Sequence, residues 1–388
     1  MQILSVHNGY KIRGGEDECH KAEVELLRDA GHRVEIYYKT NDDTASLSSL
    51  QLLSKTLWSR EAHHEVSNHL KSNLYDIVHV HNFFPLISPA IYYAAQERGI
   101  PVVQTLHNYR LLCVNALLFR DGHVCEDCVG QLIPVSGIVH RCYRDSLGAS
   151  ALTASMLLMH HTLKTWTQQV DVYIALTKFA RQKFIEGGLP ADKVVVKPNF
   201  VNPDPGVGSG AGGYILYVGR LSIEKGLDTL ISAWERMGIT TPLKIVGDGP
   251  LSSQVAQAAE HSQYIEWFGR RPLAEVYELI GDAKALIFPS KWYETFGRVA
   301  IEAFAKGTPV IAANIGAIAE LVQHRCTGLH FLPGDAVDLA KQVFWLQDNP
   351  QELENMRQKS RIEFEENYTA EANYQRLMEI YDLAIKEK

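Results

Sequence analysis

Ala285-Leu-Ile-Phe-Pro-Ser290 is a short apolar run closed by proline, and Tyr293-Glu-Thr-Phe-Gly-Arg-Val-Ala-Ile-Glu-Ala-Phe-Ala-Lys-Gly307 follows it with apolar residues at helical spacing. The first pattern is typical of a buried strand end, and the second predicts a helix that stops at Gly307. Glu294 is therefore expected in the loop at a strand's carboxyl end, and Glu302 about two turns into the next helix. Open α/β sheets bind ligands in such loops. Phe296-Gly297 would offer backbone N–H groups there to an anionic or hydroxyl-rich ligand.

The same alternation of strands and helices continues to both sides of this stretch. It predicts right-handed βαβ units and two parallel sheets. The first helix is expected from the stripe Cys19, Ala22, Leu26 and Ala30. The expected strands are 3–6, 34–38, 76–80, 101–105, 172–176 and 194–196 in the first half, and 214–218, 243–246, 264–268, 285–288, 309–312 and 328–332 in the second.

The stretch 198–213 is almost continuous Pro, Gly, Asn, Asp and Ser, which indicates a linker between two domains. The predicted organisation is a Rossmann-like domain at 1–198 with a cysteine-containing insertion at 108–146, a linker at 199–213, a second Rossmann-like domain at 214–369, and a terminal helix at 370–388. A chain of 388 residues is long enough for two cores.

The composition excludes several classes of protein. A net charge of −7 gives no general attraction for nucleic acid, so no nucleic-acid partner is expected. The amino-terminal residues lack a signal-peptide layout, and no apolar run is long enough to span a membrane. Six cysteines in a chain of this length do not indicate a disulfide scaffold. A cytoplasmic location is expected, with peripheral contact at the inner face of the membrane left open.

The pair Glu294 and Glu302, eight positions apart, resembles the glutamate-x7-glutamate motif of retaining glycosyltransferases of family 4, which have the GT-B fold. Two glutamates alone would also fit a solvated helix face, but the surrounding strand, Pro-Ser and glycine favour the motif. The resemblance implies that the Glu294 region holds the donor hexose and that Glu302 binds the nucleotide ribose. It also implies an active site in the cleft between the two domains and a terminal helix that returns to the first domain.

A second motif, Gly219-Arg-Leu-Ser-Ile-Glu-Lys-Gly226, lies between a predicted strand and a helix and resembles the family's glycine-arginine-x3-glutamate-lysine-glycine pattern. Arg220 and Lys225 would neutralise the charge that develops on a diphosphate leaving group. No strand-ending Asp-x-Asp pair is present, so no catalytic metal is expected. The remaining predicted nucleotide-sugar contacts are Gly219, Arg270, Phe296, Gly297, Arg298 and Val299. Gly247 ends a predicted strand in Gly247-Asp-Gly-Pro250, which fits either a tight turn near the nucleotide or ordinary turn chemistry.

The first half carries weaker signals. Gly14-Gly15 opens the first helix and resembles the family's glycine-rich first loop, whose N–H groups reach the diphosphate. The spacing G-x-G-x-x-G is absent, which argues against a dinucleotide cofactor. His107 occupies a strand end where the family places a histidine beside the donor sugar. The aspartate that commonly follows is Asn108 here, so that role does not carry over. His79 and His81 share one face of a strand, either lining the acceptor side or partly buried.

The four cysteines of the insertion, Cys113, Cys125, Cys128 and Cys142, have a C-x2-C pair at their centre. This arrangement fits either a structural zinc site or thiols in an irregular loop. Asp121-Gly122 between them predicts a hairpin turn.

The sequence as a whole predicts a retaining glycosyltransferase that moves a hexose, with glucose the favoured choice, from a uridine diphosphate sugar to a hydroxyl group of a glycan or lipid-linked oligosaccharide. Two alternatives stay open. One is a nucleotide-sugar 2-epimerase of the same fold, and the other is an inactive GT-B module that binds glycans or proteins.

Overall fold

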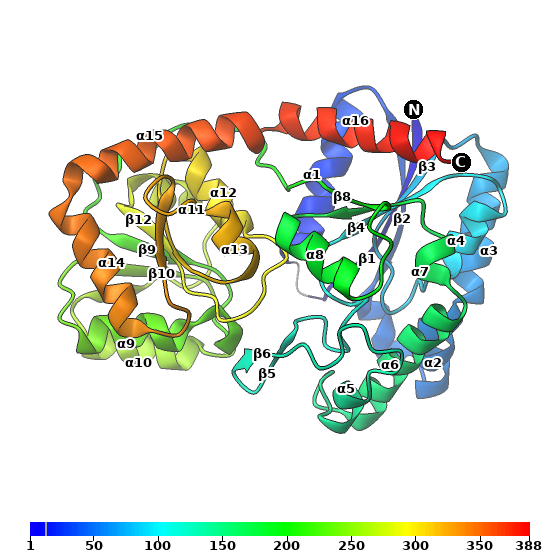
Figure 1. Ribbon diagram of the computed structural model, residues 1–388, viewed down its shortest axis with the longest axis horizontal. Helices are drawn as coiled ribbons and strands as arrows, with labels where there is room; N and C mark the ends of the chain where they lie inside the picture. Colours follow the sequence, from blue (N-terminus) through cyan, green and yellow to red (C-terminus); the bar gives the residue numbers. More distant parts are fainter. Residues whose placement is uncertain (12–13) are drawn as a thin grey trace. The chain divides into compact units, whose positions relative to one another are not determined.

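The computed structural model describes residues 1–11 and 14–388, and the chain divides into two compact units (Figure 1). Unit 1 comprises 1–118, 126–199 and 373–388, and unit 2 comprises 119–125 and 200–372. Each unit contains a six-stranded sheet in which every neighbouring pair is parallel. The predicted α/β class with two Rossmann-like sheets is thereby confirmed.

The sheet of unit 1 has the strand order β2-β1-β3-β4-β7-β8. Its strands are β1 (Gln2–Gly9), β2 (Arg33–Thr40), β3 (Ile77–Asn82), β4 (Val102–Leu106), β7 (Val172–Ala175) and β8 (Val194–Val196). β1 lies between β2 and β3, so the connections run to opposite sides of β1. This switch in direction opens a crevice at the carboxyl ends of β1 and β3.

Helices from both ends of the chain belong to this unit. They are α1 (Gly15–Asp29), α2 (Ser49–Trp58), α3 (Arg60–Ser72), α4 (Ala90–Gln96), α5 (Val135–Val139), α6 (Leu147–Thr162), α7 (Thr165–Gln168), α8 (Lys178–Glu186) and α16 (Ala370–Lys386), with the 3-10 turn η1 (Asn41–Ser46). Leu377 and Tyr381 of α16 belong to the same buried cluster as Ile3, Leu27 and Ile77. The carboxyl-terminal helix therefore completes the core of unit 1.

The sheet of unit 2 has the order β11-β10-β9-β12-β13-β14. Its strands are β9 (Ile215–Val218), β10 (Leu243–Val246), β11 (Ile265–Trp267), β12 (Ala285–Phe288), β13 (Val310–Ala313) and β14 (Gly328–Phe331). Its helices are α9 (Leu227–Arg236), α10 (Ser252–His261), α11 (Leu273–Asp282), α12 (Arg298–Ala305), α13 (Gly316–Leu321), α14 (Ala336–Asp348) and α15 (Pro350–Asn367), with η2 (Ile223–Lys225). The direction switch falls between β9 and β12.

The helix predicted from the stripe Cys19, Ala22, Leu26 and Ala30 is confirmed as α1, but the stripe is only part of its buried face. Leu26 is buried, Cys19 and Ala22 are half-buried and Ala30 is exposed. The other buried residues are His20, Glu23, Val24 and Leu27, and periodicity counted over apolar residues alone missed the two that are polar.

The hairpin predicted at Asp121-Gly122 is confirmed. Strands β5 (Phe119–Arg120) and β6 (His123–Val124) pair antiparallel, and both turn residues have positive φ. None of the helices in the described ranges combines the length and the apolar composition that crossing a bilayer requires.

Candidate functional site

The direction switch in unit 2 brings the two predicted motifs together. β9 leads into Gly219 and Arg220, and β12 leads into Pro289 and the loop that carries Glu294. The backbone N–H of Lys291 donates to the carbonyl oxygen of Glu224 at 2.9 Å, which ties the loop after β12 to η2. The two motifs, about seventy positions apart in the sequence, therefore form one structural site at the carboxyl edge of the sheet.

The carboxylate of Glu294 is the centre of this site. Its Oε1 accepts from Lys225 Nζ at 2.6 Å, from Ser290 Oγ at 2.8 Å and from Trp292 Nε1 at 2.8 Å. Glu294 is 8% exposed, and the Lys225 ammonium also lies 5.3 Å from the centroid of the Trp292 ring. The three donors fix the carboxylate, so a polar ligand would meet a preorganised group.

A glycine between η2 and α9 allows this approach. Gly226 has φ of 71°, and a Cβ added there would lie 1.9 Å from the carbonyl oxygen of Pro289. Any other residue would push η2, and with it Lys225, away from the end of β12. Gly247 plays a similar part at the end of β10, where an added Cβ would lie 1.9 Å from the carbonyl oxygen of Gly219.

Two predicted arginines lie at the exposed rim of unit 2. The Arg220 side chain is exposed, and within the described ranges its guanidinium makes no hydrogen bond or ion pair, although its carbonyl oxygen accepts from Tyr217 Oη at 2.9 Å. Arg270 is also exposed. It lies close enough to Asp248, in the turn after β10, to help lower the pKa of that carboxyl, which Ser252 and Gly249 lower more strongly by hydrogen bonding.

The rest of the predicted set lies at the start of α12. Gly297 is its N-cap, Phe296 is buried, and Val299 is half-buried. Arg298 Nε lies 3.0 Å from Glu302 Oε1. Glu302 is the fifth residue of α12 and is 6% exposed, so it lies closer to the helix start than the predicted two turns, because the helix begins only at Arg298.

In unit 1 the direction switch lies between β1 and β3. Gly14 is the N-cap of α1, and its N–H donates to Asp17 Oδ2 at 2.9 Å. His7 Nε2 lies 3.0 Å from Asp17 Oδ1, which also accepts from the N–H of Tyr10 at 3.2 Å. Burial would raise the pKa of Asp17, but these hydrogen bonds lower it. The predicted diphosphate contact at Gly14 would therefore compete with Asp17. Ile12 and Arg13 of this loop lie outside the described residues.

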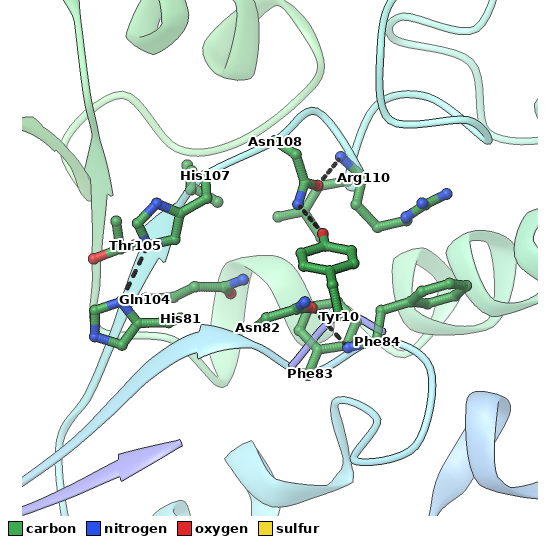
Figure 2. Close-up of a pocket in the computed structure, with 12 residues that line it drawn as sticks. Tyr10, His81, Asn82, Phe83, Phe84, Gln104, Thr105, His107, Asn108 and Arg110 are labelled. Atoms are coloured by element: carbon green, nitrogen blue, oxygen red, sulfur yellow. Dashed lines mark hydrogen bonds between the residues drawn. The ribbon is translucent and has the colours of Figure 1, made fainter. Parts of the chain in front are cut away.

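His107 and Asn108 line a pocket at the carboxyl ends of β3 and β4 (Figure 2). Asn108 Nδ2 donates to Glu16 Oε2 at 3.0 Å, and Tyr10 Oη donates to the same oxygen at 3.1 Å. Burial raises the pKa of Glu16 to about 7. Sequence reasoning missed Glu16, because nothing local connects a residue of α1 with one that follows β4.

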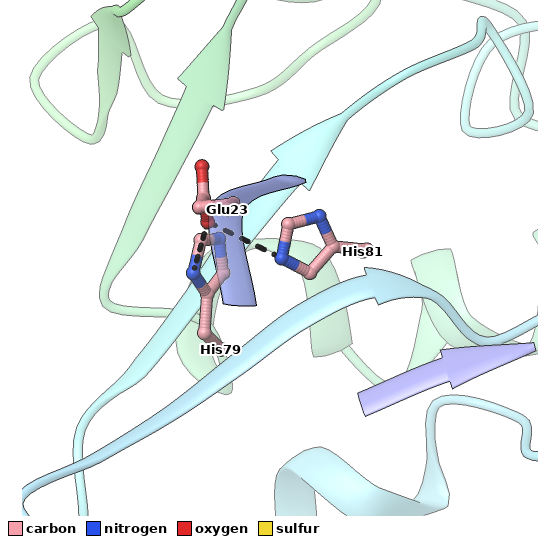
Figure 3. A group of neighbouring side chains, drawn as sticks. All are labelled: Glu23, His79 and His81. Carbon is pink, nitrogen blue, oxygen red and sulfur yellow. Dashed lines mark ion pairs between the residues drawn. The ribbon is translucent and has the colours of Figure 1, made fainter. Parts of the chain in front are cut away.

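Behind His107 lies a buried polar cluster that sequence reasoning found only in part. His79 and His81 do share a face of β3, and both lie near Glu23 Oε1, at 3.1 Å from His79 Nδ1 and 3.3 Å from His81 Nε2 (Figure 3). Both histidines are buried, at 1% and 4% exposure, and His81 also lines the pocket beside His107. Glu23 Oε2 also pairs with Lys197 Nζ at 2.8 Å.

The cysteines of the insertion are distributed over both units. Cys125 belongs to unit 2, whereas Cys113, Cys128 and Cys142 belong to unit 1. Cys113 is buried and its thiol donates to Asn115 Oδ1 at 2.9 Å. A zinc site built from all four stays a prediction.

Two family models match adjoining parts of the chain. The model described as Glycosyltransferase Family 4 matches residues 22–205, and that described as Glycosyl transferases group 1 matches residues 209–363. The chain belongs to glycosyltransferase family 4. The resemblance seen in the sequence is confirmed at the level of the family.

Two related proteins align with different lengths of this chain. Glycogen synthase of Mycobacterium tuberculosis is 38% identical over 142 residues, a stretch that spans 35% of this chain and only about a third, 34%, of that enzyme. Spore coat protein SA of Bacillus subtilis is 22% identical over 394 residues, covering 96% of this chain and 95% of that protein.

Solved structures share the fold over the whole chain. HepE of Anabaena, in complex with UDP and glucose, aligns with a TM-score of 0.69 at 18% identity and covers 98% of this chain and 99% of its own. Sucrose-phosphate synthase of Thermosynechococcus elongatus aligns with a TM-score of 0.74 at 17% identity and covers 100% of both chains. The fold is therefore GT-B.

Proposed function

We propose that the protein is a retaining glycosyltransferase that moves a hexose, glucose in our assignment, from a uridine diphosphate sugar to a hydroxyl group of a glycan or lipid-linked oligosaccharide in polysaccharide biosynthesis. The observation that carries the proposal is the Lys225–Glu294 contact of 2.6 Å at the direction switch of unit 2. The contact joins the cation that we assign to the diphosphate and the carboxylate that we assign to the sugar, at the edge of the sheet where such folds bind ligands.

The proposed chemistry uses these residues in a defined order. The bond between the anomeric carbon and the diphosphate breaks, and the leaving nucleotide takes the electron pair. Arg220 and Lys225 stabilise the negative charge on its phosphate oxygens. The acceptor hydroxyl attacks the same face of the sugar, and its proton passes to the departing phosphate. Glu294 orients the hexose, and Glu302 binds the ribose hydroxyl groups.

The relatives support the donor class. HepE of Anabaena has been solved with UDP-glucose bound, and its fold matches this chain with a TM-score of 0.69. Glycogen synthase of Mycobacterium tuberculosis matches 142 residues of this chain. We extend the uridine nucleotide and the glucose from these proteins to this one as part of the proposal.

Calorimetric titration with UDP, run beside transfer assays with UDP-glucose, tests the proposal. Arg220→Ala and Lys225→Ala should each weaken UDP binding roughly 10- to 100-fold, because each removes a charge-assisted contact worth about 1.5–3 kcal/mol. Lys341→Ala removes an exposed lysine of α14 and serves as the matched control, with unchanged binding. Wild-type affinity for UDP in both site variants would rule out the assignment.

The same measurements separate the alternatives. An epimerase would convert the nucleotide sugar in the absence of any acceptor, and an inactive module would show neither conversion nor transfer. Either result would replace the transferase assignment.

A further inference from the structure

A cavity of about 570 Å³ lies within unit 1 and has no part in the site described above. Its walls come from the insertion after β4, from the end of α6 with α7, and from the turn after α8, all labelled helices in Figure 1. The volume falls in the range of pockets that hold small molecules, about 300–1,000 Å³. The lining residues are Leu111, Leu112, Cys128, Gly130, Gln131, Leu132, Pro134, Leu157, His161, Lys164, Trp166, Thr167, Gln168, Gly187, Gly188 and Leu189.

The inner wall of this cavity is apolar. Leu112, Leu157, Trp166 and Leu189 line it, and none of the four is more than 6% exposed. Leucine side chains offer water no hydrogen-bond partner, so water beside them is loosely held and an apolar group displaces it favourably. The inner wall therefore favours a hydrocarbon chain.

The rim of the cavity is basic. Lys164 and His161 both line it and are exposed, and the backbone N–H of Lys164 donates to the carbonyl oxygen of His161 at 2.9 Å. Over the described ranges, Lys164 Nζ forms no ion pair or hydrogen bond, and no Asp or Glu lines the cavity. The nearby carboxylates of Glu126 and Glu186 both pair with Lys183 at 2.9 Å. The rim therefore attracts an anion, although the chain as a whole carries a net charge of −7.

The backbone at Lys164 has a conformation that lysine rarely adopts. Its φ of 53° and ψ of 28° are left-handed, which is unfavourable for a residue with a Cβ. Its carbonyl oxygen accepts from the N–H of Gln168 at 2.9 Å and from Thr167 Oγ1 at 3.1 Å, and these contacts hold the turn. Because a glycine would adopt this turn without cost, what the lysine adds at the rim is its ammonium group.

The cavity adjoins the pocket at the carboxyl ends of β3 and β4 that Figure 2 shows. Leu111 lines both the cavity and that pocket. A ligand in the cavity would therefore lie next to the candidate site of unit 1.

We propose that this cavity binds a lipid phosphate, with its single hydrocarbon chain against the leucines of the inner wall and its phosphate at Lys164 and His161. Both residues can donate to phosphate oxygens, and the lysine adds a full positive charge. The further step, that this lipid is the carrier of the acceptor, rests on the proposed function. It selects a lipid-linked oligosaccharide over a free glycan as the acceptor.

A bilayer surface is the competing partner, because exposed apolar residues lie beside the cavity. Leu132, Ile133 and Leu163 are 52%, 47% and 45% exposed. A bilayer would touch these outer residues, whereas a lipid inside the cavity would reach the buried Trp166 ring. The indole of Trp166 therefore distinguishes the two partners.

Fluorescence quenching of the full-length protein by bromododecyl phosphate tests the proposal, because a bromine atom in contact with an indole quenches it. Below its micelle concentration this probe should quench saturably with one site per chain, and the quenching should disappear in Trp166→Phe. Bromododecanol, which lacks the phosphate, should bind at least about tenfold more weakly, since it loses the charge-assisted contacts. Absence of Trp166 quenching, or quenching only by phosphatidylcholine vesicles that contain brominated phosphatidylglycerol, would overturn the proposal.

A charge variant tests the place of the phosphate. Lys164→Met keeps an unbranched side chain but removes the ammonium, so the Kd for bromododecyl phosphate should rise about tenfold or more while that for bromododecanol stays the same. Lys71→Met, at an exposed lysine of α3 outside the cavity, is the matched control and should bind both probes like the wild type. Wild-type affinity for the phosphate probe in Lys164→Met would overturn the assignment of the phosphate.

A second pair of variants does not depend on the turn at Lys164. Leu132 and Leu147 are almost equally exposed, at 52% and 53%, but only Leu132 lines the cavity. Leu132→Asp should weaken binding of bromododecyl phosphate about tenfold, because a carboxylate at the rim repels the phosphate. Leu147→Asp should leave it unchanged. Equal affinities in these two variants would overturn the cavity as the binding site.

Calorimetry with UDP on the same protein separates this inference from the proposed function. UDP binding without binding of the lipid phosphate would overturn the inference and leave a free glycan as the acceptor. Lipid phosphate binding without UDP binding would refute the proposed function and the acceptor role, while the lipid site itself would stand.

Discussion

Glu294 and Glu302 are carboxylates in different surroundings, and the difference supports the different roles that we propose for them. Glu294 Oε1 is held by three donors, of which Lys225 is the closest at 2.6 Å. Glu302 pairs with Arg298 one helical turn away, and burial together with Glu302 raises the pKa of Tyr277 to about 12. Glu294 thus contacts Lys225, the cation that we propose for the diphosphate, whereas Glu302 lies in α12 beside Arg298.

This difference predicts that the same substitution, glutamate to glutamine, lowers the turnover rate at one position and the affinity for UDP at the other. Glu294→Gln should lower kcat while leaving the affinity for free UDP nearly unchanged, because its contact strengthens when the sugar acquires charge. Glu302→Gln should weaken UDP binding by about 1.5–3 kcal/mol, because a charged acceptor for the ribose is lost. Calorimetry with UDP and steady-state assays with UDP-glucose measure both.

Glu320→Gln on α13 is the control, since it removes a carboxylate outside both motifs. If both site variants bind and turn over like the wild type, neither glutamate acts at the site, and Glu302 is only a charge near the start of α12, worth about 0.3–1 kcal/mol.

At the residue level the sequence revealed the groups that belong to local motifs. Arg220, Lys225, Glu294 and Glu302 could be proposed from the sequence because fixed spacings around glycines mark them. Glu23 and Lys197 could not be found, since they are 174 positions apart and a lone lysine after a strand forms no pattern. A buried ion pair is recognisable only once tertiary structure brings its partners together.

Among the elements, η2 depends on one glycine for its place in the site. Gly226 and Gly238 have nearly the same φ, 71° and 70°, but an added Cβ would meet the Pro289 carbonyl oxygen at 1.9 Å in the first case and nothing within 4 Å in the second. Gly226→Ala should therefore destabilise the protein by about 1–3 kcal/mol more than Gly238→Ala and should also weaken UDP binding. Urea unfolding and calorimetry measure the two effects. Equal losses in both variants would show that the contact with Pro289 plays no part.

The strands could be predicted because parallel sheets buried on both faces give continuous apolar runs. The place of the glycine-rich segment 198–213 is harder to predict, because its composition alone indicates a flexible linker. In the structure Gly210 N donates to Gly281 O and Gly212 N donates to Asp282 O, both at 2.9 Å, and Arg357 Nη2 donates to Gly208 O. Much of this segment therefore lies along unit 2, and its glycines permit close approach of two backbones, a contact that composition does not reveal.

On the scale of the whole molecule, the two units bury ionisable groups to different extents. Unit 1 encloses His20, His81 and His160, and burial lowers the pKa of each, that of His160 to about 4. In unit 2 the histidines with lowered pKa are His324, which is exposed, and His330, which is half-buried. Unit 1 should consequently respond more strongly to acid than unit 2.

The sign follows from proton binding. A histidine with a depressed pKa stays neutral in the folded unit, while the same histidine in the unfolded chain takes up a proton below about pH 6.5. The unfolded state then binds more protons than the folded state, so the stability of the unit decreases as the pH decreases. Each of the three histidines should reduce the stability of unit 1 by about 1 kcal/mol between pH 7 and pH 5.5. Glu23, whose pKa is also depressed, keeps its contribution throughout this window, because that contribution is lost only below the pKa of an unfolded glutamate, about 4.3.

Pulse proteolysis in urea, with fragments assigned by mass spectrometry, follows each unit separately, which a chain of two domains requires. We expect the urea midpoint of unit 1 to fall markedly from pH 7 to pH 5.5 and that of unit 2 to change less. His160→Gln removes one of the three histidines and lies outside the proposed site. The number of protons that unit 1 takes up on unfolding should fall by up to one, so its stability should depend less on pH. UDP binding should stay unchanged. Equal pH dependence of the two units, or an unaltered slope in His160→Gln, would contradict the assignment of acid sensitivity to buried neutral histidines.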